Sequence, residues 1–379
     1  MKISTVTTYL QSYFSSGPSY IILYITNRCN QKCKFCFYAD SLNAPSGDFL
    51  TLEEIEKVGQ SVYPCIQWTL SGGETFIRKD LVDIVITLIK YAGARNITFT
   101  TNGSLTDRII FTLEKLCKEY PFVDFRIGLS IDGLEEKHDA IRGMQGAFQK
   151  AEHTFHEIKK LQKHFFNLHL SINTVASKYN KDSLKKFIDY AVENLWCDDH
   201  SLTLVRGITR GQDAKNISPL EYQNLVSYFE RRKAGKFQAE TFHKKLLKFI
   251  ETETRAIVNK TFQENAFQIT CVAGMKLAVL YDSGSLYPCE IIQTLNWPES
   301  VKKNFGGNFE IGNVRDFDYN VNAMIKSGRG KALYEFIVSS KCFCTFECSI
   351  AASIVFNLRT LLKTVFSPLS SKAYLARKM

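Results

Sequence analysis

The 379-residue sequence lacks any apolar run long enough to cross a lipid bilayer, which takes about 20 residues in a helix. Its most strongly apolar runs, Tyr20–Ile25 and Ser349–Phe356, are short. Residues 1–20 mix polar and aromatic side chains, so they also lack the apolar core of a signal peptide. These absences predict a cytoplasmic protein.

Cysteine is scarce, with 11 residues among 379, which is far below the density of a disulfide-stabilised fold. The cysteines are also unevenly spread. Three lie at positions 29, 33 and 36, and five lie at 271, 289, 342, 344 and 348. In a reducing compartment, such closely spaced cysteines indicate metal ligands or catalytic thiols before disulfides. The remaining three, Cys65, Cys117 and Cys197, are expected to be small apolar core residues.

Acidic residues are outnumbered, because 48 Lys and Arg stand against 38 Asp and Glu, giving a net charge of +10. Positive charge concentrates at Arg231, Arg232, Lys233, Lys236, Lys244, Lys245 and Lys248. This pattern indicates a solvated helix face, with a dock for an anionic partner as the alternative. No specific nucleic-acid-binding module is present. The basic, amphipathic C-terminal tail is expected to pack on the protein, with a weak membrane-surface contact as the alternative.

Apolar runs rich in β-branched and aromatic residues recur along the first part of the chain, and helical patterns follow them. The predicted strands are Tyr20–Thr26, Ile66–Leu70, Asn96–Thr101, Val123–Ile131, Asn167–Val175 and Ser201–Val205. This alternation predicts an α/β fold with a parallel sheet and right-handed crossovers. Six such units fit a partial or full barrel, and an open doubly wound sheet is the alternative.

The pattern changes after Arg210. Helices are predicted from Ser218 to about Gln263, followed by a β-hairpin that turns at Gly284. We therefore divide the chain into a barrel (18–215), a helical linker (216–265), a small α+β domain (266–348) and a tail (349–379).

Cys29, Cys33 and Cys36 form a C-x3-C-x2-C pattern directly after the first predicted strand. Three thiolates on one loop can hold three irons of a [4Fe–4S] cluster and leave the fourth iron open. Barrel enzymes place their chemistry at the carboxyl ends of the strands, which is where this loop is expected to lie. A zinc site completed by a distant residue is the alternative.

This pattern resembles the hallmark of the radical SAM superfamily, and the resemblance extends from about Tyr20 to Arg210. It implies a partial (β/α)6 TIM-type barrel. It also implies that Cys29, Cys33 and Cys36 hold a catalytic [4Fe–4S] cluster that cleaves S-adenosylmethionine (SAM) to methionine and a 5′-deoxyadenosyl radical, which abstracts a substrate hydrogen. A reducing partner such as flavodoxin or ferredoxin would supply the electron.

Further matches to this family follow the early strands. Phe35 corresponds to the aromatic residue beside the adenine of SAM. Gly72, Gly73 and Glu74 resemble the element that binds the methionine amino group, and Asn102 follows the third strand. The glycines would let the cofactor approach the backbone closely.

The resemblance continues at the later strands. Ser130 and Arg142 match residues that contact the SAM carboxylate, and Asn173 matches the ribose ligand. Val205 lies near the expected adenine. Asp132 belongs to the same set, with the capping of a turn as its alternative role.

The second cysteine group has the pattern C-x12-G-x4-C from Cys271 to Cys289, followed by Cys342, Cys344 and Cys348. It resembles the auxiliary-cluster region of the SPASM and twitch subfamilies. Five cysteines cannot fully ligate two [4Fe–4S] clusters, so one auxiliary cluster is expected. The implied ligands are Cys271, Cys289 and Cys348, together with Cys342 or Cys344, and a zinc site is the alternative.

The substrate stays open. An auxiliary cluster would accept an electron from a substrate radical or only shape the pocket, and Glu290 beside Cys289 is a candidate base or an exposed structural residue. Because about 20 residues precede the first strand, we expect a small molecule, a sugar, a lipid precursor or a leader-independent peptide rather than leader-guided maturation. An RNA-modifying enzyme and a non-catalytic Fe–S protein are the alternatives.

Overall fold

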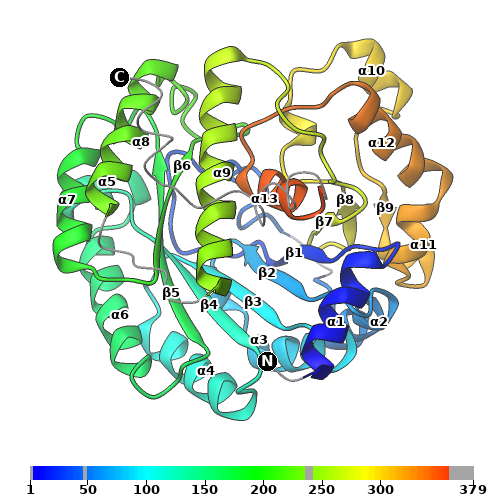
Figure 1. Cartoon of the computed structure of the whole chain (residues 1–379), viewed down its shortest axis with the longest axis horizontal. Coiled ribbons are helices and arrows are strands. Elements are labelled where there is room, and N and C mark those ends of the chain that lie inside the picture. Colours follow the sequence, from blue (N-terminus) through cyan, green and yellow to red (C-terminus); the bar gives the residue numbers. More distant parts are fainter. Residues whose placement is uncertain (1–2, 46–48, 235–241, 358–379) are drawn as a thin grey trace.

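The computed structural model describes residues 3–45, 49–234 and 242–357. Six parallel strands form its centre: β1 (Tyr20–Thr26), β2 (Gln67–Gly72), β3 (Asn96–Thr101), β4 (Asp124–Ser130), β5 (Leu168–Ala176) and β6 (Asp199–Leu204). They lie side by side in sequence order (Figure 1). A doubly wound sheet would reverse this order at a switch point. The curved, singly wound sheet therefore confirms the predicted partial barrel.

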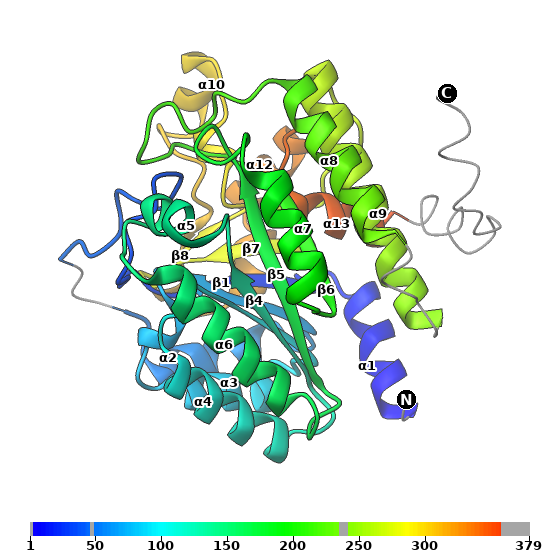
Figure 2. The same ribbon diagram turned by 90° about the vertical axis from the view of Figure 1, so that its left-hand side faces the viewer.

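Helices cover the outer face of this sheet. They are α2 (Leu52–Ser61), η1 (Thr75–Ile77), α3 (Leu81–Tyr91), α4 (Thr106–Glu119), α5 (Glu135–Arg142), α6 (Ala147–Leu161) and α7 (Leu184–Asn194). Figure 2 shows α2, α3, α4 and α6 along one side of the strands. The strand side chains that face the helices are apolar and fully buried, such as Trp68, Phe99 and Phe125. A capping box of Thr51 and Glu54 begins α2.

The predicted hairpin is formed by β7 (Leu277–Leu280) and β8 (Ser285–Tyr287), with β9 (Gly312–Asn313) beyond it. It is not a separate sheet, because β7 pairs in parallel with β1 and extends the barrel sheet to nine strands. All four residues of β7 are buried, as expected for a central strand that is covered on both faces. The boundary predicted at residue 266 therefore does not coincide with a break in the sheet.

The remaining elements surround the hairpin and the open side of the barrel. They are α8 (Pro219–Lys233), α9 (Phe242–Glu264), η2 (Ile292–Thr294), α10 (Glu299–Asn304), η3 (Val314–Phe317), α11 (Val321–Lys326), α12 (Gly328–Ser339) and α13 (Glu347–Val355). Helix α9 packs against α8 and α13 (Figure 1). A capping box of Ser218 and Glu221 begins α8, with Pro219 in the first helical turn.

Helix α1 (Ile3–Phe14) precedes the barrel and was not predicted. Lys276 holds its carboxyl end, because the buried Nζ donates to the carbonyl oxygens of Tyr13 at 2.8 Å and Ser15 at 2.5 Å. A cation at the end of a helix satisfies carbonyl groups that have no partner within the helix. This contact joins residues more than 260 positions apart, so local sequence could not reveal it.

The predicted basic face is partly wrong. Lys233 is buried, and its ammonium forms 2.7 Å ion pairs with Asp199 and Glu251. Arg232 pairs with Asp189 and Glu193 of α7. These two charges bind α8 to its neighbours. They therefore belong neither to a solvated helix face nor to a dock for an anionic partner. Lys236 and the tail residues 358–379 lie outside the described residues, as do the side chains of Lys244 and Lys245.

Within the described ranges, no helix combines the length and the apolar character needed to cross a bilayer.

Candidate active site

The first three cysteines lie on the loop that leaves the carboxyl end of β1, as predicted. Asn43 fixes the start of this loop, because its Oδ1 accepts from the backbone N–H of Cys29 at 3.1 Å and its Nδ2 donates to the Cys29 carbonyl at 3.0 Å. Burial raises the pKa of the Cys29 thiol to about 12 and that of Cys36 to about 11. Metal binding would therefore displace protons from these thiols.

Gly72 and Gly73 bring the end of β2 against this loop. A Cβ atom on Gly72 would lie 2.2 Å from the carbonyl oxygen of Thr26, and one on Gly73 would lie 2.1 Å from that of Arg28. The backbone N–H of Gly73 donates to Thr26 at 2.8 Å. The sequence predicted that these glycines let a cofactor approach the backbone. In the structure, the group that leaves no room for a side chain at either position is the backbone of the cysteine loop.

Glu74 joins the end of β2 to the end of β3. Its buried carboxylate accepts from the Thr101 hydroxyl and the Asn102 N–H, both at 2.7 Å, and from the Phe76 N–H at 3.1 Å. Burial raises the pKa of Glu74, and these three bonds oppose the rise. Asn102 in turn donates to the side chain of Asn30 at 2.9 Å, which ties β3 to the cysteine loop.

Arg142 connects the loop with the end of β4. Its guanidinium lies 2.5 Å from the carboxylate of Asp132 and 3.7 Å from the Cys33 sulfur, and it covers the Phe35 ring at 5.4 Å. Burial raises the pKa of Asp132, and the Arg142 charge lowers it. Arg142 was expected to bind a carboxylate, and in this structure that carboxylate is Asp132. Asp132 also accepts from the Val175 N–H at 2.8 Å, so it joins β4 to β5.

Of the last three predicted SAM residues, Ser130 ends β4, Asn173 lies within β5 three residues before its end, and Val205 follows β6. Ser130 and Asn173 are register partners on adjacent strands, and both are partly exposed. Val205 is buried, and its N–H bonds to the Ala176 carbonyl at 3.0 Å. The predicted SAM residues therefore gather toward the carboxyl edge of the sheet, with Asn173 set back within β5.

The second cysteine group comes together from distant segments. Burial raises the pKa of Cys289, and the neighbouring thiols of Cys344, Cys271 and Cys342 raise it further. Cys348 has different neighbours: burial raises its pKa to about 11, Glu290 adds to the rise, and Arg206 opposes it. Over the described ranges, no three His, Cys, Asp or Glu side chains converge on a single-ion position.

Glu290 is not exposed, which corrects the expected structural role. Its side chain is 7% exposed, and its Oε1 accepts from the Tyr24 hydroxyl at 2.9 Å. Burial raises the pKa of Glu290, while Arg206 lowers it from a distance of 3.5 Å. Arg206 also pairs with Glu347 at 2.5 Å. Neither Arg206 nor Glu347 was singled out from the sequence, although both adjoin residues that were.

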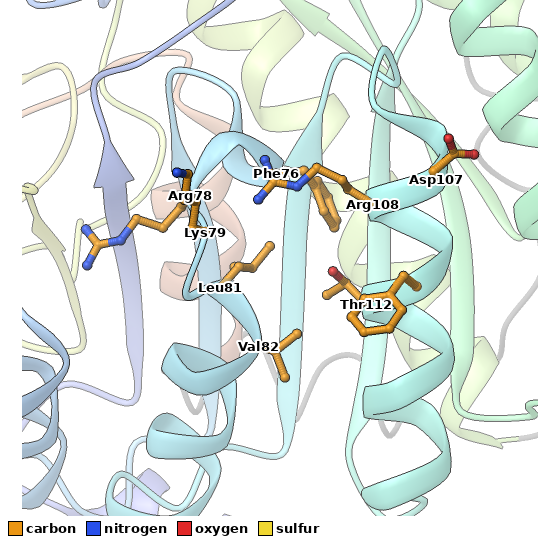
Figure 3. A pocket seen from close by; sticks show the side chains of 9 residues that line it. Phe76, Arg78, Lys79, Leu81, Val82, Asp107, Arg108 and Thr112 are labelled. Atoms are coloured by element: carbon orange, nitrogen blue, oxygen red, sulfur yellow. The ribbon is translucent and has the colours of Figure 1, made fainter.

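A separate surface pocket of about 260 Å³ lies between η1, α3 and the first turns of α4 (Figure 3). Its lining includes Phe76, Lys79 and Arg108, and none of the predicted site residues. It is therefore distinct from the edge of the sheet where the cysteine loop lies.

The model of the radical SAM superfamily matches residues 23–191. This range contains the second half of β1, the cysteine loop and strands β2 to β5. Residues 23–191 thus belong to the radical SAM superfamily. The chain is therefore an enzyme whose family uses a [4Fe–4S] cluster and SAM, and the thiols of Cys29, Cys33 and Cys36 on one loop are chemically suited to that cluster.

Two curated relatives of this radical SAM chain are enzymes. An AdoMet-dependent heme synthase from Methanosarcina barkeri is 28% identical over 297 residues, which cover 74% of this chain and 79% of the synthase. A GTP 3′,8-cyclase from Paracoccus denitrificans is 26% identical, over 52% of this chain and 55% of the cyclase. The chain thus spans about half of that second relative.

Solved structures share the fold. Native anSMEcpe with bound AdoMet matches with a TM-score of 0.57 and 15% identity, over 92% of this chain and 99% of that one. SuiB from Streptococcus suis bound to its precursor peptide matches with a TM-score of 0.52 and 17% identity. That match covers 78% of this chain and 64% of SuiB.

Proposed function

We propose that this radical SAM enzyme removes a hydrogen atom from a polar substrate held inside the barrel and then oxidises the substrate. The observation that supports this is the position of Cys29, Cys33 and Cys36 on one loop at the carboxyl edge of the sheet. When bound there, a [4Fe–4S] cluster supplies the electron that cleaves SAM to methionine and a 5′-deoxyadenosyl radical.

The residues around the loop would position the cofactor. Gly72 and Gly73 hold the end of β2 against the loop, and Arg142 keeps positive charge beside Cys33. The partly exposed Ser130 and Asn173 leave polar groups available on β4 and β5. Glu74 accepts three bonds from the protein, so we assign it first to fixing β2 against β3 and second to the SAM amino group.

An auxiliary [4Fe–4S] cluster would be held by the second cysteine group. Neighbouring thiols among Cys271, Cys289, Cys342 and Cys344 raise the pKa of Cys289, Cys342 and Cys344. This proximity favours these four thiols as the ligands of the auxiliary cluster. Such a cluster would receive the electron that the substrate radical gives up. Cys348 stays an alternative ligand, because it lies in the same region beside Glu290.

Glu290 would take the proton that leaves during this oxidation. A buried carboxylate with a raised pKa is suited to act as a general base near neutral pH. Tyr24 on β1 and Arg206 after β6 hold it from two strands of the barrel sheet. Its contacts therefore link the strand that leads into the first cysteine loop with the end of the hairpin at Cys289.

The inner face of the barrel favours a polar substrate. On β3 and β6, Thr98, Thr100, Ser201 and Thr203 are partly exposed and alternate with buried apolar residues. Among the described residues, Arg206 Nε and Glu290 Oε2 are buried without a hydrogen-bond partner. A substrate hydroxyl would supply the missing partner for either atom, because it can both donate and accept a hydrogen bond.

A second candidate is a heme precursor as substrate. It is favoured by the identity to the AdoMet-dependent heme synthase, which extends over 79% of that relative. Heme precursors and polyhydroxylated small molecules are therefore the first two substrate classes to compare.

The test is anaerobic reconstitution with iron and sulfide, followed by SAM and dithionite, with flavodoxin as the alternative reductant. We expect 5′-deoxyadenosine from the wild type and none when Cys29, Cys33 and Cys36 are replaced with alanine. Deuterium transfer from labelled substrates into 5′-deoxyadenosine would identify the substrate class. A fully loaded protein that forms no 5′-deoxyadenosine in its own cell lysate would refute the proposal.

A further inference from the structure

Arg206 lies where three cysteine-bearing segments meet. It follows β6, and its guanidinium lies 5.6 Å from the Phe37 ring, next to Cys36 on the first cysteine loop. It also lies 4.7 Å from the Phe346 ring, two residues before Cys348. The same guanidinium pairs with Glu347 at 2.5 Å and with Glu290 at 3.5 Å.

Each of these partners is close in sequence to a cysteine of one of the two groups. Phe37 adjoins Cys36, Glu290 adjoins Cys289, and Glu347 adjoins Cys348. Arg206 therefore joins the first cysteine loop, the end of the hairpin and the start of α13 through one side chain. A guanidinium is suited to this role, because its planar group can pair with carboxylates and stack on aromatic rings at once.

Arg206 is shielded from water, which strengthens the interaction of its charge with neighbouring groups. The side chain is only 18% exposed, and its two carboxylate partners are 7% and 19% exposed. Charges act more strongly on each other where water is excluded.

We propose that Arg206 is a positioning residue that sets the reduction potential of the auxiliary cluster and holds that site against the SAM-cluster loop. The proposal rests on the auxiliary cluster of the proposed function. Net charge and solvent exposure around a cluster are among the factors that set its potential. A fixed positive charge favours the reduced cluster, which carries one more electron, and Glu290 and Glu347 partly offset it.

The test is the midpoint potential of the auxiliary cluster, followed by electron paramagnetic resonance during an anaerobic redox titration. To isolate its signal, the background carries alanine at Cys29, Cys33 and Cys36. We expect Arg206→Gln to shift the potential to more negative values and Glu347→Gln to shift it to more positive values. The double variant should return toward the parent.

Arg232→Gln is the matched control, because Arg232 also pairs with two carboxylates but lies between α7 and α8. Its potential should equal that of the parent. If Arg206→Gln does not fold, Glu347→Gln still tests the charge effect, since it leaves Arg206 and Glu290 in place. If the variants hold full auxiliary iron and keep the potential of the parent, the inference about Arg206 is overturned but the auxiliary site is not. A parent protein with no auxiliary iron would instead overturn the auxiliary site and the inference with it.

Discussion

Arg142 and Asp132 form an ion pair beneath the cysteine loop, with 2.5 Å between Nη2 and Oδ2 and with both side chains almost fully buried. The same guanidinium reaches the Cys33 sulfur at 3.7 Å. The end of β4 is thereby bound to the loop that carries the first three cysteines. Removing one partner of such a buried ion pair strongly destabilises the fold, because the other charge is left buried without its counter-charge.

Asp132→Asn should therefore lower the free energy of unfolding by about 3–5 kcal/mol, because Arg142 would stay buried without its counter-charge. Urea denaturation of the reduced protein at neutral pH measures this. Glu53→Gln is the control, since it breaks an exposed pair with Lys57 on α2 and should leave the stability unchanged. Equal stability of the two variants would contradict a structural role for the Arg142–Asp132 pair.

Gly73→Ala should displace the cysteine loop, because the added Cβ would lie 2.1 Å from the Arg28 carbonyl oxygen. We expect loss of the iron held by Cys29, Cys33 and Cys36 and a large loss of 5′-deoxyadenosine formation. Auxiliary iron should be retained. Gly328→Ala is the control, since no atom lies within 4 Å of a Cβ added at that position. Normal iron content in Gly73→Ala would show that the loop can shift without cost.

The strands of the barrel and the residues at their carboxyl ends could be predicted because both signals are local. Apolar runs separated by helical patterns predicted all six parallel strands, within a few residues of their observed bounds. The motifs follow those runs directly, so strand order alone gathers them at one edge. The contacts of Glu74 with Asn102 and of Arg142 with Cys33 were not predictable, since they join residues 28 and 109 positions apart.

The pairing of β7 with β1 and the burial of Glu290 show where sequence reasoning ends. Leu277–Leu280 is apolar at every position, which indicates a strand but does not identify its neighbour. Glu290 gave no local sign of burial, because its partners Tyr24 and Arg206 are 266 and 84 residues away in the sequence. Only the folded sheet brings them together.

Cys344→Ala and Cys348→Ala should differ in auxiliary iron content. Cys344 adjoins the other thiols of the second group, whereas the neighbours of Cys348 are Glu290 and Arg206. We expect Cys344→Ala to lose most auxiliary iron and Cys348→Ala to retain it, as measured by iron analysis after reconstitution. Cys117→Ala, in the buried core of α4, controls for the loss of a thiol. The reverse result would make Cys348 the ligand.

Glu54 links α2 to the segment after the hairpin, and this link should weaken in acid. Its carboxylate accepts from Arg315 at 2.7 Å and from the Tyr319 hydroxyl at 3.0 Å. Burial raises the pKa of Glu54, but the bonds from Arg315, Thr51 and Tyr319 outweigh it and bring the pKa from 4.5 to about 2.

A depressed pKa means that the ionised carboxylate stabilises the fold, and that this stabilisation is lost as the carboxylate becomes protonated. The stability that Glu54→Gln removes should therefore be constant above pH 4.5 and should shrink as the pH falls toward 2. Urea denaturation of the wild type and the variant across this range measures the difference. Arg315→Gln should remove most of the same pH dependence, because it takes away the main partner of the carboxylate. A difference between wild type and Glu54→Gln that does not change with pH would mean that Glu54 acts only through its neutral hydrogen bonds.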